Sequence, residues 1–102
     1  MRSHKTELII PPTAQSDKNA REVVRAWIAH GGLHCSIDPA IWSNEQGCIG
    51  WGILLSDIAR HVADALNKES GLDKQQTLQA IRKTFDVEIQ SPTAETKGEF
   101  LH

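Results

Sequence analysis

The feature that most constrains the fold is a stripe of apolar residues at helical spacing in the second half of the chain. Its members lie one, three or four positions apart, while the polar residues between them fall on the opposite side of a helix. They are Trp51, Leu54, Leu55, Ile58, Val62, Ala65 and Leu66. The stripe predicts an amphipathic helix over about 51–68. Its start is open between Asn44 and Trp51, because each of the glycines at 47, 50 and 52 weakens a helix by about 1 kcal/mol.

A β-hairpin is predicted before this helix, because two alternating segments flank Gly31-Gly32. Glycine supplies the positive φ angles of a two-residue turn, so we place Gly31 and Gly32 in the turn, with His30 opposite Leu33. A three-residue turn would direct Arg25 into an apolar face, at a cost. The predicted apolar face, on which His30 is the one polar member, holds Val24, Ala26, Ile28, Leu33, Cys35 and Ile37. The second face holds Arg25, Trp27, His34 and Ser36.

Three shorter segments complete the predicted elements. Ser70-Gly71 ends the long helix, and a capping box of Asp73 and Gln76 starts a second helix at about 73–85. The alternation after residue 85 predicts a short strand at about 87–90, and residues 8–10 allow at most a brief edge strand. The expected fold class is α+β, with a small antiparallel sheet centred on the hairpin and packed by the long helix and the shorter one.

The domain organisation follows from these elements and from the length of 102 residues, which is about one domain. We expect an N-terminal segment over 1–20, a single α+β domain over 21–90 and a polar C-terminal tail over 91–102. The longest apolar run near the N-terminus covers only residues 8–10, too short for a signal peptide or a membrane span. Two cysteines without a CxxC pattern suit a reducing compartment. We therefore expect a cytoplasmic protein.

The charge pattern argues against two classes of partner. The net charge is −2 and the eleven basic residues are dispersed, which does not suit a nucleic-acid surface. The polar side of the long helix mixes Asp57 and Asp64 with Arg60 and Lys68, so it lacks the basic excess of a membrane-binding helix. We expect neither nucleic acid nor membrane as a partner.

The hairpin and the long helix together resemble a family. Three segments carry the resemblance: Glu7-Leu8-Ile9-Ile10-Pro11-Pro12, Val24-Arg25-Ala26-Trp27-Ile28-Ala29-His30-Gly31-Gly32-Leu33-His34-Cys35-Ser36-Ile37 and Trp51-Gly52-Ile53-Leu54-Leu55-Ser56-Asp57-Ile58-Ala59-Arg60-His61-Val62-Ala63. The chain is similar over about residues 7–67 to small bacterial proteins of about a hundred residues, which form a domain of unknown function with an RxWIAxGGLHxS hairpin and a WGxxLxDxARH helix. The resemblance implies a small α+β fold in the bacterial cytoplasm, and it implies no activity, cofactor or catalytic residue.

Motifs for chemistry are weak, so we predict no catalytic residue, no metal site and no cofactor. His30, His34, Cys35 and His61 are potential metal ligands, but the predicted register directs His30 and His34 to opposite faces. Asp57 can orient His61 at i and i+4, as Arg60 can pair with Asp64, yet ordinary helix surfaces show the same spacing. The glycines at 47–52 lack the lysine of a phosphate-binding loop, and we interpret them as a flexible lead-in that lets the helix approach the sheet.

Trp27 provides the main functional hypothesis. It lies beside Arg25 on the second hairpin face, and one helix layer does not cover both sides of a sheet. Tryptophan and arginine are enriched where interfaces bind most strongly. We expect a non-enzymatic interaction or homo-oligomerisation module, in which a second subunit or an unknown protein covers this face, unless the second helix or the N-terminal segment does. The alternative is a small enzyme or ligand-binding protein with a site between hairpin and helix; the candidate residues for either are Arg25, Trp27, His34, Ser36, Arg60 and His61.

Overall fold

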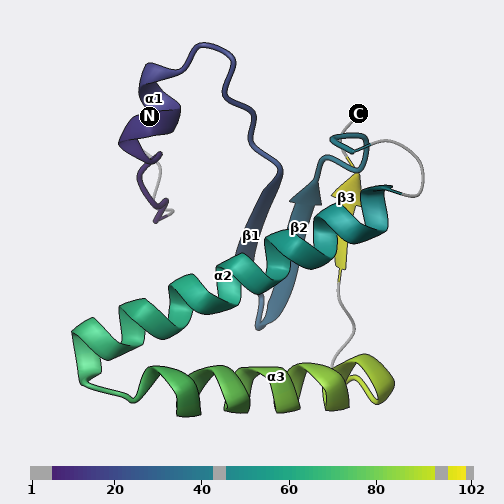
Figure 1. Ribbon diagram of the computed structural model, residues 1–102. Coiled ribbons are helices and arrows are strands. Elements are labelled where there is room, and N and C mark those ends of the chain that lie inside the picture. The colour runs from purple at the N-terminus through teal and green to yellow at the C-terminus, as the bar shows by residue number, and fades with distance from the viewer. Residues whose placement is uncertain (1–5, 43–45, 94–96, 101–102) are drawn as a thin grey trace.

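The computed structural model describes residues 6–42, 46–93 and 97–100, and it confirms the α+β class (Figure 1). The elements in chain order are α1 (Pro12–Ser16), β1 (Val24–Ala29), β2 (Gly32–Ile37), α2 (Gln46–Ser70), α3 (Lys74–Gln90) and β3 (Lys97–Phe100). The strand order is β1-β2-β3. β1 and β2 form the predicted antiparallel hairpin, and β3 joins β2 in parallel, so the sheet is mixed.

The hairpin turn differs from the prediction by one residue. His30 and Gly31 form the turn, with φ angles of 51° and 75°, and Gly32 lies in β2 opposite Ala29. Ile28 therefore pairs with Leu33. The prediction required glycine at both positive-φ positions. A positive φ at one histidine costs little free energy, so the pairing of the two strands can hold His30 in that conformation. The two faces keep their predicted membership, because the observed pairing is shifted from the predicted one by two residues, and side chains two residues apart lie on the same face of a strand.

Helix α2 confirms the predicted long helix, and its glycines belong to the helix itself. It begins at Gln46, within the predicted interval, and Gly71 follows its last residue with a φ of 72°, as a C-terminal glycine should. Gly50 permits a close approach: a Cβ there would lie 2.5 Å from Cδ2 of Trp42. The Trp42 ring in turn meets Trp51 edge to face, with ring centroids 5.6 Å apart. The interpretation of these glycines as a flexible lead-in was wrong, because they belong to the helix. The close approach that Gly50 permits is to Trp42, which follows β2, and not to the sheet itself.

Helix α3 starts as predicted and continues further. The Asp73 side chain accepts a hydrogen bond from the Gln76 backbone N–H at 2.9 Å. The helix ends at Gln90, so the strand predicted at 87–90 was wrong. An alternating pattern of four residues is a weak strand signal. A helix that has already formed gains one hydrogen bond with each residue added, which favours its continuation through residues 87–90.

The two ends of the chain also differ from the sequence expectation. Residues 6–11 are not part of a strand, and a short helix, α1, follows them after Pro11. The region expected to be a polar tail contains β3, which pairs in parallel with β2 from His34 to Ile37. Parallel pairing joins segments distant in sequence, and local composition does not reveal it.

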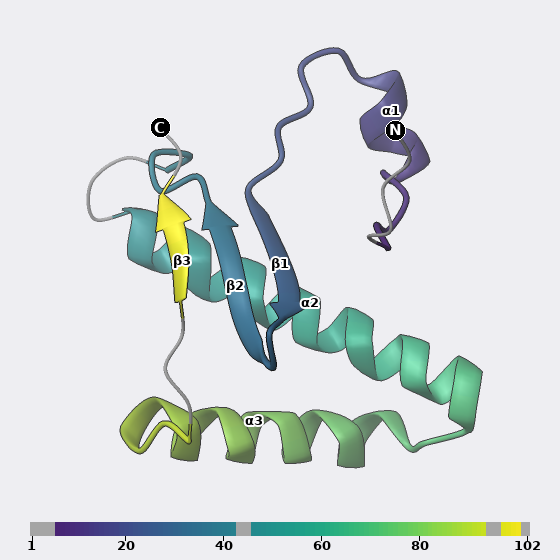
Figure 2. The ribbon, with the colours of Figure 1, turned by 180° about the vertical axis from the view of Figure 1, so that it is seen from behind.

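The helices cover the sheet only in part. Figures 1 and 2 show that the first half of α2 crosses one face of the sheet, and that its second half extends past the β1 edge. α3 then runs back antiparallel to α2, and the two helices diverge away from their connection. Within residues 6–42, 46–93 and 97–100, every helix is too short or too polar to cross a lipid bilayer.

Burial in a single chain is very low. Among the residues at 6–42 and 46–93, Ala63 alone is buried, with 1% of its surface exposed. The radius of gyration is 15.7 Å, against about 13 Å for a compact domain of this length. The chain exposes 9179 Å², against about 5,700 Å² for a folded monomer of its mass. One copy of the chain thus has secondary structure with almost no core.

Candidate functional site

The structure separates the predicted site residues into two groups. Arg25, Trp27, His34 and Ser36 share the second face of the hairpin, with Arg25 opposite Ser36 and Trp27 opposite His34. Arg60 and His61 lie on α2, where both are exposed. The two groups line different cavities: Arg25 and Trp27 one, Arg60 and His61 the other. A single pocket that unites all of them is not formed within the described residues of one chain.

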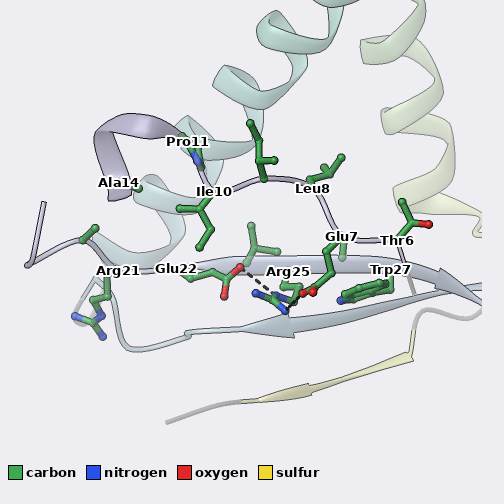
Figure 3. A pocket seen from close by; sticks show the side chains of 14 residues that line it. Thr6, Glu7, Leu8, Ile10, Pro11, Ala14, Arg21, Glu22, Arg25 and Trp27 are labelled. Carbon is green, nitrogen blue, oxygen red and sulfur yellow. Dashed lines mark hydrogen bonds and ion pairs between the residues drawn. The ribbon is translucent and has the colours of Figure 1, made fainter. Parts of the chain in front are cut away.

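The first cavity lies between residues 6–11 and β1, and we call it the N-terminal cavity (Figure 3). Its volume is about 600 Å³, and its lining is mainly apolar. Trp27 contributes to its wall and is half-buried. The N-terminal segment therefore lies near Trp27 within the same chain, which was one of the two covers considered for this side chain.

Arg25 forms one ion pair with Glu7 of the N-terminal segment and another with Glu22, just before β1. Its Nη1 lies 3.1 Å from Glu7 Oε2, and its Nε lies 3.1 Å from Glu22 Oε2 (Figure 3). Glu22, and after it Glu7, raise the pKa of the Arg25 guanidinium above its ordinary value. All three side chains are exposed, so each pair contributes little to stability. The apolar side chains of this segment have little cover, and Leu8 is 95% exposed.

The second cavity, of about 400 Å³, lies where α2 meets α3. It contains Arg60 and His61, but the ion pairs differ from those that the i,i+4 spacing predicts. Arg60 pairs with Asp57 rather than Asp64, and Asp64 Oδ1 lies 3.1 Å from Lys74 Nζ at the start of α3. Asp57 is therefore engaged by a guanidinium and does not orient His61. The Asp64–Lys74 pair joins the two helices, whereas the Arg60–Asp57 pair lies within α2.

Lys74 sets the protonation of Asp64. Its ammonium lowers the pKa of the Asp64 carboxyl, by a hydrogen bond first and by charge second, and Lys68 adds a smaller effect. Because the folded pKa lies below the unfolded one, the pair stabilises the fold above the ordinary carboxyl pKa and loses its effect as the pH falls through the folded value. We expect Lys74→Gln to raise the Asp64 pKa more than Lys68→Gln does. Carbon-detected NMR titration of the carboxyl measures both, and equal shifts would contradict the assignment.

Metal ligands do not gather in the part of the chain that the structure describes. Within it, no three side chains among histidine, cysteine, aspartate and glutamate lie close enough to share a metal ion. His30 lies in the turn, and His34 lies on β2. Cys35 and Cys48 are both free thiols.

The surface that sequence reasoning missed is the second half of the α2 stripe. We call it the overhanging stripe, and it consists of Leu55, Ile58, Val62 and Leu66. The sequence assigned these side chains to the core, yet they are 36–45% exposed. The second half of α2, which carries Val62 and Leu66, extends beyond the sheet. By contrast Trp51 and Leu54, earlier in the same stripe, are half-buried. The stripe is thus covered at one end and open at the other.

The fold and the open apolar surface define a small α+β protein. The comparisons with known proteins place it more closely. A family model described as a domain of unknown function (DUF5076) matches residues 7–93. The chain belongs to this family, so the predicted resemblance is confirmed and extends through α3.

Among the solved structures that are similar to this chain is one that matches it over its whole length. It is a protein of the photosynthetic bacterium Rhodopseudomonas palustrus CGA009, described as "a putative pyruvate dehydrogenase". The identity is 30%, the TM-score is 0.70, and the match covers 99% of our chain and 100% of the other. No curated protein matches the chain.

Proposed function

We propose that the chain is a non-enzymatic homo-oligomerisation module whose core is completed by a second copy. The observation that carries this proposal is that Ala63 alone is buried among residues 6–42 and 46–93. Ordering a chain of this length costs on the order of 100 kcal/mol of conformational entropy, and burial of apolar side chains is the main term that offsets it. The other apolar side chains of the described residues are only partly buried, so one chain supplies little of that term, and a second copy would supply more of it.

The exposed area supports the same proposal. The chain exposes roughly 3,400 Å² more than a compact monomer of its mass. Obligate dimers bury about 2,000–5,000 Å² in total, so two copies carry ample surface for such an interface. Exposed leucine and isoleucine side chains on α2, on α3 and on the hairpin, where Ile28 is 77% exposed, supply its apolar part.

A ligand-binding or catalytic function has less support. It required Arg25, His34, Arg60 and His61 to converge between hairpin and helix, and these residues are divided between separate places. The activity named for the similar structure would need a set of convergent side chains, and the described residues of this chain assemble none. Neither observation favours a second candidate function.

The test is the mass of the protein in solution as a function of concentration. We expect light scattering behind size-exclusion chromatography to give at least twice the chain mass of 11.3 kDa wherever the protein is folded. The melting temperature should rise with protein concentration, because association stabilises the folded state by mass action. A folded monomer that unfolds cooperatively at a concentration-independent temperature would refute the proposal.

A further inference from the structure

We infer that the overhanging stripe of α2 is the contact between two copies, and that it packs against the same stripe of the second copy across a two-fold axis. This inference rests on the proposed function and names the surface that performs it. A two-fold contact requires one patch that is complementary to itself, and a straight apolar line on a helix satisfies this condition when the second helix crosses it.

The chain itself leaves this line uncovered. The sheet ends before the second half of α2 (Figure 1). Helix α3 packs on a different side, since the Asn67 side chain donates a hydrogen bond at 2.7 Å to the backbone carbonyl of Leu72 and Ala63 shares a cavity with Leu78. At 3.6 residues per turn, Ala63 and Asn67 lie roughly a quarter turn or more around the helix from the centre of the stripe. Neither the sheet nor α3 therefore covers the stripe.

The paired charges of this part of α2 lie away from the stripe. Asp57 pairs with Arg60, and Asp64 pairs with Lys74. These pairs occupy the other side of the helix, so a second copy that packs on the stripe leaves them in water. Glu69, in the last turn of α2, is the charged residue that follows Leu66 on the side of the stripe, and it is exposed. A contact built on this line thus avoids the largest cost of forming an interface.

The other exposed apolar line on α2 is a poorer candidate. Ile49 and Ile53 are more exposed than the stripe, with Ile53 at 58%. However, Ser56 and Arg60 lie on the same side of α2 as these two isoleucines. A helix packed there would contact a hydroxyl and a charged group. Trp27, the anchor considered from the sequence, is half-buried and lines the N-terminal cavity of its own chain.

A second copy is the occupant that the energetics favour. The residues at 6–42 and 46–93 form almost no core within one chain. A partner that completes the core has to be present whenever the chain folds, and another copy of the chain always is. The surface that each copy exposes beyond a compact monomer exceeds the roughly 800 Å² per partner of a standard interface. A patch that both copies share also needs no second gene product to be made in matching amount.

The first test compares two isoleucines on the same helix. We expect Ile58→Asp to raise the dimer dissociation constant by at least about a hundredfold, because both copies then place a carboxylate in the apolar contact. Ile53→Asp, the matched control, and Trp27→Ala should leave the constant within about threefold of wild type. Sedimentation equilibrium measures all three. Equal effects of Ile58→Asp and Ile53→Asp, or dissociation by Trp27→Ala alone, would overturn the inference.

Cross-linking keeps the inference testable if Ile58→Asp does not fold. Leu55→Cys, Ile58→Cys, Val62→Cys and Leu66→Cys are made one at a time in a background with Cys35→Ser and Cys48→Ser. We expect a short bismaleimide to join two copies efficiently at the position nearest the axis, with yields falling on either side. Yields no higher than that of Ile53→Cys would refute this surface while leaving the dimer intact. A wild-type monomer would instead refute the proposed function itself.

Discussion

Gly50→Ala is expected to lower the free energy of unfolding by about 1–3 kcal/mol, although alanine favours a helix over glycine by about 1 kcal/mol. The reason is steric. The added Cβ would lie 2.5–2.9 Å from three atoms of the Trp42 indole, closer than real Cβ atoms come. The ring is rigid and rests edge to face on Trp51, so relief of the clash also disturbs that contact.

Gly52 provides the matched control, two residues further along the same helix. A Cβ at Gly52 would meet no atom within 4 Å. Gly52→Ala is therefore expected to raise the free energy of unfolding by about 0.5–1 kcal/mol, through helix propensity alone. Urea denaturation of both variants at one fixed protein concentration measures the difference. If both substitutions stabilise the protein, the Trp42 ring does not lie against Gly50.

Ala63→Asp is expected to lower the free energy of unfolding by about 2–4 kcal/mol. Ala63 is the one buried position among residues 6–42 and 46–93, and it lies where α2 meets α3. A carboxylate there would lose its water, and it would stand close to the negative charge of Asp64. Ala80→Asp, on the exposed side of α3, adds the same group to a helix and should cost only about 0.5 kcal/mol.

The pH dependence of this variant gives a second check on burial. Burial raises the pKa of a carboxyl, so the group introduced by Ala63→Asp would have a higher pKa in the folded state than in the unfolded state. The loss of stability should then be full above the folded pKa and should shrink as the pH falls below it. A loss that stays the same down to pH values of about 4 would show that the introduced carboxyl remains hydrated.

Local patterns predicted those parts of the fold that depend on neighbours along the chain. The helix stripe and the Asp73 capping box involve residues within a few positions of one another, and both are confirmed. The hairpin faces are also confirmed, since face membership depends only on alternation. The turn itself was misplaced, because the strands tolerate a positive φ at His30 that intrinsic preference disfavours.

Features that depend on distant partners were not predictable. β3 forms by pairing with β2, and both α2 and α3 lie between these two strands in the sequence. Asp64 forms its ion pair with Lys74 of α3 and not with Arg60, four residues before it in α2. Leu55, Ile58, Val62 and Leu66 are exposed although they belong to the apolar stripe. A helical period indicates which side of a helix is apolar without showing which other element covers it.

The strand order has a consequence for the sequence of events in folding. The β1–β2 hairpin joins adjacent segments across a two-residue turn, and such hairpins form within about 1–10 microseconds. The β2–β3 pairing closes a loop that contains both α2 and α3, and the entropy of that closure must be lost before any of its hydrogen bonds form. We therefore expect the parallel strand to pair with β2 after the hairpin has formed.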